Sequence, residues 1–586
     1  MSLVCWRVWP TAASTSSRRS TSMISTANAV THWRKGSSFA LLAFLSACGS
    51  AGPTPDLLLT NAALVTLASA SPTSGAIAVT GGRITCVGDC QPGPKTRILD
   101  LSGRTVLPGF ADSHLHLSGV GFREMELNLE GTQSLDQLLA GLAARVSQTR
   151  PGEWIVGRGW IEAQWDPPVF PTAADLDRFS PENPVYLARA DGHAGVANSK
   201  ALQIAGVTGD TKPPLGGDIL HDSLGVPTGM LIDRAQSLVR THMPRQTPEK
   251  LREALVRGAE FLAGKGWTQV SVAGASAAEL EAIEQLIDEG LIGLRVYGAM
   301  AGPSEDAEKL LSEGPRPRHD GRFSVRGVKI VMDGALGSRG AALEQPYSDG
   351  PSTSGLLMHE PSELLPFLER ALRSGIQIQT HAIGDRANRI MLDLYGQAFA
   401  AVPEAERAVA EPRWRIEHAQ ILRPADIPRF AQLGVIPSME ASHAITDLHF
   451  APARLGPERL AGAYAWRALV DAGSKIAGGS DAPVERGDPL VELYAAAVRK
   501  DLNGFSDDDW HREQRLTREE ALRTLTDWAA YATFEEDKRG SIEVGKWADF
   551  TVLSGNPLEV PEAEIPLLEV AMTIVGGRVI YDSSAR

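Results

Sequence analysis

The chain has 586 residues, of which 43% are hydrophobic, with a formal net charge of -14 and four cysteines. This length supplies a large core and allows more than one domain. The acidic balance argues against a nucleic-acid partner, because phosphate binding needs a basic surface. Four cysteines are too few for a disulfide scaffold in a chain of this size.

The first 48 residues are typical of an export signal rather than of a folded domain. The basic pair Arg34-Lys35 precedes an apolar run, Phe39–Phe44, which is too short to span a bilayer. The segment Leu45-Ser46-Ala47-Cys48-Gly49 resembles a bacterial lipobox. That resemblance implies cleavage before Cys48 and lipid attachment to its sulfur, with residues 49–55 as a flexible tether. The alternative is an ordinary secretory signal that is cut near the same place.

Two further features follow from this export signal. A basic region normally lies close to the initiator methionine, so Met23 is the expected start and residues 1–22 a mis-assigned extension. We expect a cell-envelope lipoprotein that is held at the membrane by its lipid alone. In an oxidising compartment Cys86 and Cys90 could form a local disulfide, and two free thiols are the alternative.

Both ends of the mature chain are rich in short β-like runs. Residues 56–105 contain such runs, separated by Gly-Gly, Gly-Asp and Pro-Gly pairs, and residues 541–586 have the same character. Each end alone would be too small and too exposed at its edges to be stable. We therefore predict one small β-sandwich that is built from both ends.

The middle of the chain, residues 106–540, alternates strand-like and helix-like segments. This alternation predicts a parallel (β/α)8 barrel of the α/β class. The eight expected strands are Val106–Phe110, Gln269–Val272, Leu294–Ala299, Gly327–Met332, Ile376–Thr380, Trp414–Glu417, Val435–Pro437 and Ile476–Gly478.

One connection in this barrel is far too long. Roughly 150 residues separate the first expected strand from the second, well beyond a normal βα connection. We therefore predict an inserted subdomain at about residues 122–250 that caps the barrel mouth.

Six metal-binding or basic residues lie at or just after the ends of the expected strands. Catalytic groups of such barrels come from the carboxyl ends of several strands. His114 and His116 share one face of their strand, because side chains alternate along it. Any one of the six is more often a structural polar group, but their joint placement predicts a site for zinc or a similar ion. The six are His114, His116, Lys329, His381, His418 and Asp481.

Lys329 stands in an apolar strand, so its amine must be paired or chemically altered. One interpretation is an ion pair with Asp333 or another carboxylate. The other is carbamylation by CO2, which would give a carboxylate that bridges two metal ions. Burial lowers the pKa of a lysine and supplies the neutral amine that this reaction needs.

Taken together, these segments resemble the amidohydrolase superfamily, and within it family 3, the YtcJ-like metal-dependent hydrolases. The resemblance covers about residues 56–581. The matching segments are residues 103–116, 329–339, 381–387, 415–420, 479–483 and 540–550.

The resemblance implies a mechanism and a role for each residue. His114, His116 and Asp481 would hold the more buried of two divalent metal ions, expected to be zinc, and carboxylated Lys329 would bridge to a second ion held by His381 and His418. A hydroxide between the metals would attack the substrate. Asp481 would act as general base and then as general acid.

We therefore expect a metal-dependent hydrolase of amide-type C–N bonds other than peptide bonds. One alternative is a mononuclear, deaminase-like hydrolase, which Lys329 disfavours because a single metal needs no bridging carboxylate. Another is an inactive, lipid-anchored binding protein, which would be expected to have lost Asp481 or a histidine. A homodimer is a candidate assembly. The pair Met439-Glu440 replaces the Gln-Pro expected in the family, so the resemblance does not identify the substrate.

Five further residues are candidate substrate contacts, and one of them, His193, is also a candidate catalytic residue as an oxyanion donor. Three have a structural alternative: His193 could make a hydrogen bond within the subdomain, Trp160 could anchor its core, and Arg339 could pair with Glu344. The five are Trp160, Asp191, His193, Arg339 and His443.

Overall fold

The computed structural model describes residues 54–585 except 69–71, 163–164, 191, 193, 215–216, 245–246, 319–320 and 507–509. The predicted signal, with Met23 and Cys48, therefore lies outside the described residues. So do two of the predicted contacts, Asp191 and His193. Within the described ranges, no helix is both long and apolar enough to cross a bilayer.

The central element is a barrel of eight parallel strands, each paired with the next one along the chain. Backbone hydrogen bonds link the first and last strands, from Asp481 N to the His114 carbonyl (2.7 Å) and from His116 N to the Ala482 carbonyl (2.8 Å). This confirms the predicted TIM-like barrel. The strands are β6 (Phe110–Leu115), β13 (Trp267–Ala275), β14 (Arg295–Ala301), β16 (Phe323–Val331), β17 (Gln377–Ala382), β18 (Arg415–His418), β19 (Ile436–Glu440) and β20 (Ala477–Gly479).

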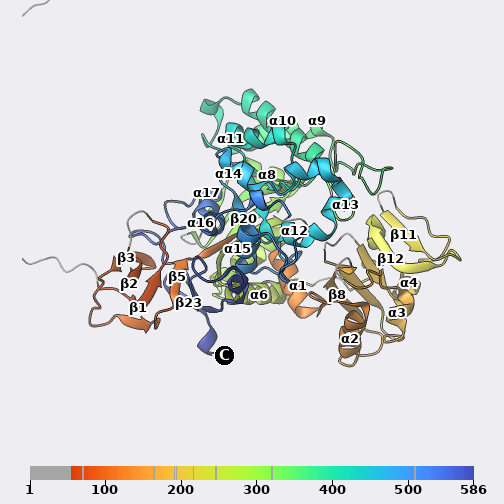
Figure 1. The fold of residues 1–586 in the computed structure, drawn as a ribbon, viewed down its shortest axis with the longest axis horizontal. Coiled ribbons are helices and arrows are strands. Elements are labelled where there is room, and N and C mark those ends of the chain that lie inside the picture. The colour runs from red at the N-terminus through yellow and green to blue at the C-terminus, as the bar shows by residue number, and fades with distance from the viewer. Residues whose placement is uncertain are drawn as a thin grey trace, which may run out of the picture. The chain divides into compact units, whose positions relative to one another are not determined.

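Amphipathic helices follow most of these strands (Figure 1). Helix α10, for example, buries Met391, Tyr395 and Ala398, which recur at three- and four-residue spacing as one apolar stripe. The main helices of this part of the chain are α6 (Pro248–Gly264), α7 (Ala277–Asp288), α8 (Glu305–Glu313), α9 (Pro361–Ser374), α10 (Asp385–Ala401), α11 (Ile427–Leu433), α12 (Ala441–Thr446), α13 (Ala451–Leu455), α14 (Trp466–Asp471), α15 (Pro489–Val498), α16 (Arg518–Thr524) and α17 (Asp527–Ala532).

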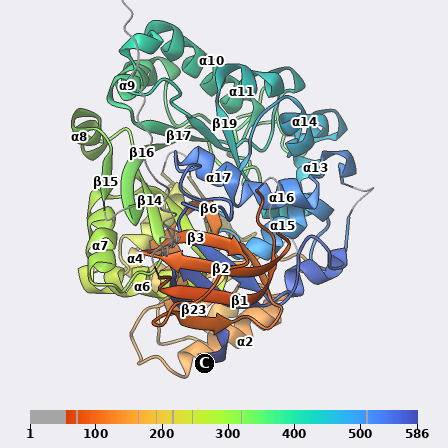
Figure 2. The ribbon, with the colours of Figure 1, turned by 90° about the vertical axis from the view of Figure 1, so that its left-hand side faces the viewer.

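Strands from both ends of the described chain share one eight-stranded sheet, in which the red N-terminal strands and blue β23 are seen together in Figure 2. The junction is β5, which pairs with β1 on one side and with β21 on the other. The strands are β1 (Leu57–Leu64), β2 (Ser74–Thr80), β3 (Arg83–Gly88), β4 (Arg97–Asp100), β5 (Thr105–Pro108), β21 (Phe550–Leu553), β22 (Val570–Val575) and β23 (Arg578–Asp582).

The first barrel strand differs from the prediction. The expected strand Val106–Phe110 is divided at Gly109 between two sheets, so that β5 belongs to the eight-stranded sheet and the barrel begins at Phe110. Gly109 packs so closely on Thr268 that an added Cβ would lie 2.4 Å from the Thr268 hydroxyl oxygen. The glycine therefore allows the chain to pass from one sheet to the other, a change of partner that an unbroken apolar run does not reveal.

The segment between β6 and β13 forms a sheet of its own, in the order β11-β12-β10-β9-β8-β7. Its elements are α1 (Leu117–Met125), β7 (Leu127–Asn128), α2 (Leu135–Val146), β8 (Ile155–Trp160), α3 (Ala173–Asp177), β9 (Val185–Arg189), β10 (Ala194–Ala197), α4 (Ser199–Ala205), β11 (Gly217–His221), β12 (Pro227–Asp233) and α5 (Ser237–Arg240).

Trp160 lies in the core of this inserted subdomain. Its side chain is fully buried beside Trp165 and Leu176, and its indole N–H donates to the Leu187 carbonyl at 3.1 Å. A substrate contact by Trp160 is therefore wrong. A large aromatic ring with one polar atom is well suited to a small core in which that atom finds a backbone partner.

Cys86 and Cys90 are joined by a disulfide next to the end of β3, so the structure decides between the two alternatives left by the sequence.

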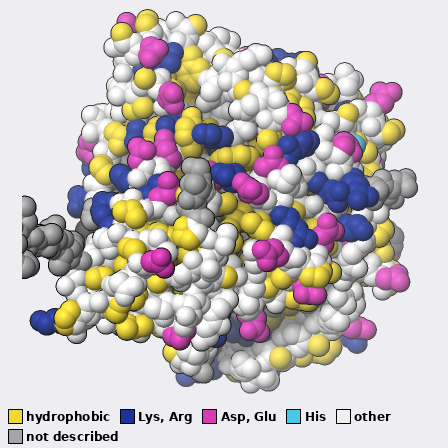
Figure 3. All heavy atoms as spheres, turned by 60° about the vertical axis from the view of Figure 1, so that its left-hand side comes forward, with side chains coloured by type: hydrophobic (Ala, Val, Ile, Leu, Met, Phe, Trp, Pro, Cys, Tyr) yellow, Lys and Arg dark blue, Asp and Glu magenta, His cyan; other side chains and the backbone are white. Residues whose placement is uncertain are grey.

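On the face shown in Figure 3, acidic and basic side chains are interspersed. Ion pairs between described residues include that of Arg413 with Glu536 at 2.7 Å.

Candidate metal centre

The six predicted ligands come together at the carboxyl ends of the barrel strands. His114 lies on β6, with His116 directly after it, and Lys329 lies on β16. His381 and His418 lie on β17 and β18, and Asp481 follows β20. Parallel strands of one barrel bring such distant positions to one rim.

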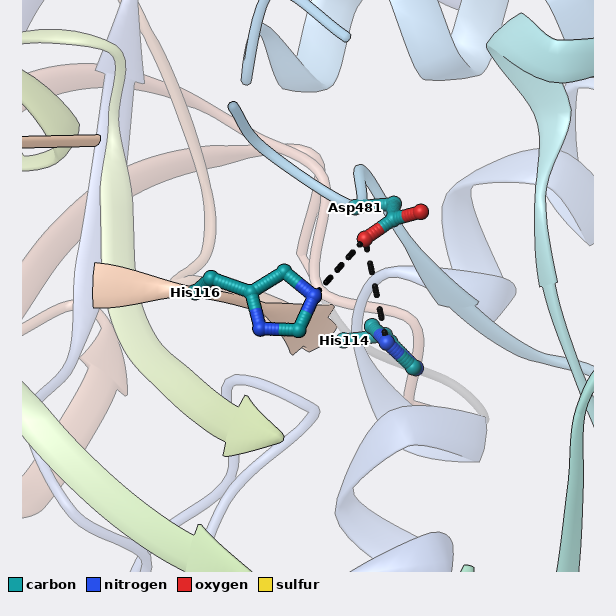
Figure 4. A group of neighbouring side chains, drawn as sticks. All are labelled: His114, His116 and Asp481. Carbon is teal, nitrogen blue, oxygen red and sulfur yellow. Dashed lines mark ion pairs between the residues drawn. The ribbon is translucent and has the colours of Figure 1, made fainter. Parts of the chain in front are cut away.

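His114, His116 and Asp481 form the first group (Figure 4). The His116 Nε2 lies 3.2 Å from Asp481 Oδ1, and the His114 Nε2 lies 3.8 Å from the same oxygen. Burial alone would raise the pKa of Asp481, but the adjacent His116 and the other neighbouring imidazoles hold that pKa well below its usual range. These three side chains converge as the ligands of one metal ion must.

Lys329 and the other two histidines continue this group. The Lys329 Nζ lies 2.9 Å from His114 Nε2. The His418 ring is centred 4.8 Å from that of His114 and 4.6 Å from that of His381. The six side chains are therefore one contiguous cluster.

Asp333 does not pair with Lys329 in the part of the chain that the structure describes. Its carboxylate instead accepts hydrogen bonds from the backbone N–H groups of Ala342, Ile383 and Gly384 at 2.8 to 3.0 Å. Asp333 thus fixes the loop after β16 against the end of β17.

Two buried glutamates orient the histidines. Glu417 Oε2 lies 2.5 Å from His114 Nδ1, and Glu440 Oε2 lies 2.8 Å from His418 Nδ1. Arg415 is buried beside them and donates to Glu417 at 2.9 Å. A carboxylate on one ring nitrogen directs the other nitrogen of a metal-binding histidine towards the ion. We did not predict either glutamate as part of the site. The sequence did contain a signal for them, because both glutamates lie at the ends of expected strands and Glu440 departs from the family's pattern.

Burial sets the protonation of the cluster. It lowers the pKa of His418 to about 4 and holds the pKa of His114 and of His381 well below the usual value. It also lowers the pKa of Lys329. The site therefore favours neutral imidazoles, which is the form that binds metal, and shifts Lys329 in the direction of its neutral amine.

The backbone is strained at two of these positions. His418 has φ of 72° and Asp481 has φ of 50°, both in the left-handed region that side chains with a Cβ rarely adopt. Such conformations cluster at functional sites, where the surrounding structure maintains them. The strained backbone at these two strand ends therefore directs the side chains of His418 and Asp481 towards the ligand cluster.

The donor atoms fit a divalent ion. His381 Nε2 and Asp481 Oδ1 are buried without a hydrogen-bond partner among the described residues. Both side chains line a cavity of about 1330 Å³ that His116, Lys329 and His418 also line. Uncompensated buried acceptors are costly, and a bound cation would satisfy them.

The remaining predicted contacts have different outcomes. His443 lines the same cavity. Arg339 does not line it but pairs with Asp349 through two hydrogen bonds of 3.1 and 3.0 Å. The predicted substrate contact by Arg339 thus stays a prediction, but its predicted partner is wrong, because Glu344 pairs with Arg389. An arginine in a polar loop has several carboxylates within reach, and spacing alone does not select among them.

Comparison with known proteins identifies the family. Residues 97–581 match the model of the amidohydrolase family named Amidohydro_3. The chain belongs to this family. It is 34% identical over 496 residues to YtcJ of Bacillus subtilis, whose name describes it as an amidohydrolase, covering 84% of this chain and 92% of that one.

Two further similarities extend this result. The chain is 28% identical over 548 residues to an N-substituted formamide deformylase of Arthrobacter pascens, covering 90% and 98% of the two chains. It is also similar to the crystal structure of an uncharacterized metal-dependent hydrolase from Pyrococcus horikoshii, with a TM-score of 0.69 and 28% identity over 86% and 99% of the chains. The family and these neighbours support a hydrolase that acts on C–N bonds and uses a divalent metal.

The orienting role of Glu440 gives a testable prediction. In Glu440→Leu, the His418 ring loses its acceptor, and we expect the affinity for the metal that His418 binds to fall by about 10- to 100-fold. Glu440→Gln keeps an acceptor oxygen and should lose less. Chelator competition measures the affinity, with Glu313→Gln at the exposed end of α8 as the control. Unchanged affinity in both Glu440 variants would show that the carboxylate does not support a ligand.

Proposed function

We propose that this protein hydrolyses amide-type C–N bonds at a two-metal centre. The observation that carries the proposal is one contiguous cluster of six suitable side chains, five of which line one cavity while His114 lies buried behind it. His114, His116 and Asp481 would hold one ion, and His381 and His418 the other. When bound, such ions bring the pKa of water towards neutrality and polarise a carbonyl group.

Lys329 would connect the two halves of the centre as a carbamate. Its neutral amine attacks CO2, a new N–C bond forms, and the nitrogen releases one proton. Burial of the lysine supports this step because it lowers the pKa of the amine. The 2.9 Å contact of Nζ with His114 Nε2 places the modified nitrogen within the ligand cluster.

Asp481 would move the proton during hydrolysis. One carboxylate oxygen takes a proton from the attacking water as the new C–O bond forms. The same carboxyl group then gives that proton to the leaving nitrogen as the C–N bond breaks. The products are a carboxylic acid and an amine, and Asp481 returns to its starting state.

His443 would donate a hydrogen bond to the substrate carbonyl. The Gln420 amide lies 2.9 Å from His443 Nδ1 and donates to it, so that the ring hydrogen lies on Nε2. Nε2 is buried, has no hydrogen-bond partner among the residues that the structure describes, and lies 3.7 Å from Asp481 Oδ2. A donor fixed beside the general base can stabilise the oxyanion that forms during attack.

This role of His443 predicts a specific kinetic effect. His443→Phe should lower kcat by about 100-fold with little change in KM, because the hydrogen bond strengthens only in the transition state. Metal content should not change. Steady-state kinetics with elemental analysis makes the test, and His449→Gln, on the same cavity wall, is the control. Loss of metal from His443→Phe would identify His443 as a ligand instead.

The proposed activity is tested by turnover of defined amides. Metal-loaded protein is incubated with N-substituted formamides, acetamides and cyclic amides, and release of the amine is measured. The similarity to an N-substituted formamide deformylase makes the formamides the first choice. We expect hydrolysis of at least one class, abolished by a chelator and restored by added metal. Absence of turnover across all three classes in fully metal-loaded protein would contradict the proposal.

We also propose that the protein is an exported lipoprotein modified at Cys48. The disulfide between Cys86 and Cys90 supports export, because disulfides persist mainly in oxidising compartments. Expression in a bacterium fed a labelled fatty acid should place the label in the membrane-bound protein. Cys48→Ser should remove both the label and the membrane association, whereas the double variant Cys86→Ser/Cys90→Ser should keep both. Label that remains in Cys48→Ser would contradict the proposal.

A further inference from the structure

The cavity beside the metal centre contains few cationic side chains. Three described lysine or arginine residues line it, and each is already engaged. Lys329 contacts His114. Arg189 binds Glu162 through two hydrogen bonds of 2.8 and 3.2 Å, and Arg486 lies 3.2 Å from Glu130. A substrate carboxylate that enters this cavity would have to displace one of these partners.

Carboxyl groups are more numerous on the same wall. Glu130, Asp447, Glu485 and Asp501 all line the cavity, in addition to Asp481 at the metal centre. Besides Glu130, which pairs with Arg486, Asp501 lies 3.3 Å from His449 Nε2 and Asp447 accepts a hydrogen bond from Tyr464. An anion on this wall would therefore meet negative rather than positive side chains.

The pKa of Glu485 indicates how unfavourable a negative charge is on this wall. Its carboxyl accepts a hydrogen bond from the Thr446 hydroxyl at 2.7 Å, yet burial raises its pKa to about 8. The wall therefore disfavours the ionised form of its own glutamate near neutral pH. A substrate carboxylate in the same place would face the same desolvation cost.

Large apolar side chains supply much of the remaining lining. Ile445, Phe450 and Val491 line the cavity, as do Val331 and Leu502. The last two are 42% and 38% exposed, which is high for large apolar residues. Exposed apolar groups that gather in one cavity mark a surface that a ligand covers.

From these observations we infer that the substrate is an uncharged amide with an apolar substituent, and that amides with a carboxylate next to the scissile bond are poor substrates. This inference rests on the proposed function and narrows it. The size of the cavity, about 1330 Å³, gives ample room for an aryl or alkyl group beside the amide.

Matched pairs of compounds test the inference. The N-formyl and N-acetyl derivatives of 2-phenylethylamine are compared with those of each enantiomer of phenylalanine, which add one α-carboxylate. The methyl esters of the phenylalanine derivatives restore an uncharged group of similar size. Metal-loaded protein should show at least tenfold higher kcat/KM for the amine derivatives and the esters than for the acids. Equal values, or a preference for the acids, would overturn the inference while leaving the proposed function intact.

If none of the compounds is hydrolysed, binding measurements test the inference about substrate charge separately from the proposed function. Isothermal titration calorimetry on the metal-loaded protein then compares the same pairs. Tighter binding of the uncharged members by tenfold or more upholds the inference even though the proposed function has failed. Equal binding, tighter binding of the acids, or no measurable binding of the uncharged members would overturn it.

A single substitution tests the charge argument directly. Leu502→Lys places a cation on the partly exposed wall of the cavity, and Leu502→Gln is the matched uncharged control. For each variant, the kcat/KM or the affinity for the acids is divided by the value for the amine derivatives. This ratio should be at least fivefold higher in Leu502→Lys than in Leu502→Gln. The same ratio in both variants would contradict the view that acids are excluded because no described lysine or arginine of the wall is available to bind them.

Discussion

Replacing Asp481 by asparagine is expected to lower kcat for amide hydrolysis by about 10³-fold, within the range measured for positioned general acids and bases. The asparagine preserves the size of the side chain but cannot take up a proton. Asp481 lines the cavity, and its Oδ1 lies 3.2 Å from His116 Nε2. Steady-state kinetics of metal-loaded wild-type and variant protein make the comparison.

The control for this substitution is Asp501→Asn, which removes another carboxylate from the same cavity. Its kcat should stay within a few-fold of the wild-type value, because Asp501 pairs with His449 and takes no part in the reaction. Asp481→Asn should also keep the metal ion that His381 and His418 bind. Hydrolysis by Asp481→Asn within tenfold of the wild-type rate would show that another group moves the proton.

Replacing Lys329 by alanine is expected to lower kcat/KM by about 10³-fold, because the loss of a metal ion removes several kcal/mol of transition-state stabilisation. The buried Nζ lies 2.9 Å from His114 Nε2, so its removal leaves a space within the ligand cluster. A short carboxylate such as acetate or propionate should enter that space and restore part of the activity. Kinetics with increasing carboxylate concentration, together with metal analysis, measure both effects.

Lys329→Met is the control for this rescue, because its side chain fills the space that the small carboxylate would occupy. We expect Lys329→Met to be as inactive as the alanine variant and not to respond to carboxylate. A second readout is the wild-type protein reconstituted with metal and 13C-labelled bicarbonate, which should show a carbamate carbon by NMR. Full activity of Lys329→Met would show that this residue does not bridge two metal ions.

The sequence predicted the barrel and its ligands because both depend on local pattern. Apolar runs separated by helical segments indicate strands, and polar residues at the ends of those runs lie at one rim whatever their separation in sequence. His114, Lys329 and His381, which are up to 267 positions apart (381 minus 114), meet for this reason.

Other features depended on contacts that no local pattern records. The division at Gly109 arises because two sheets compete for one apolar run. The roles of Glu417 and Glu440 depend on which histidine each one contacts, His114 from a distant strand and His418 from the adjacent strand. Arg339 had several carboxylates within reach, and only the folded loop shows that Asp349 is its partner.

The most direct test of the central claim is the metal content of the purified protein, measured by elemental analysis beside its activity. The account predicts two divalent ions per chain and amide hydrolysis that rises with metal occupancy. In the double variant His114→Asn/His116→Asn it predicts loss of the ion that these two residues hold and loss of hydrolysis. Circular dichroism of the double variant establishes that it is folded. Wild-type protein that hydrolyses amides without metal, or a folded double variant that keeps both ions and full activity, would contradict the account.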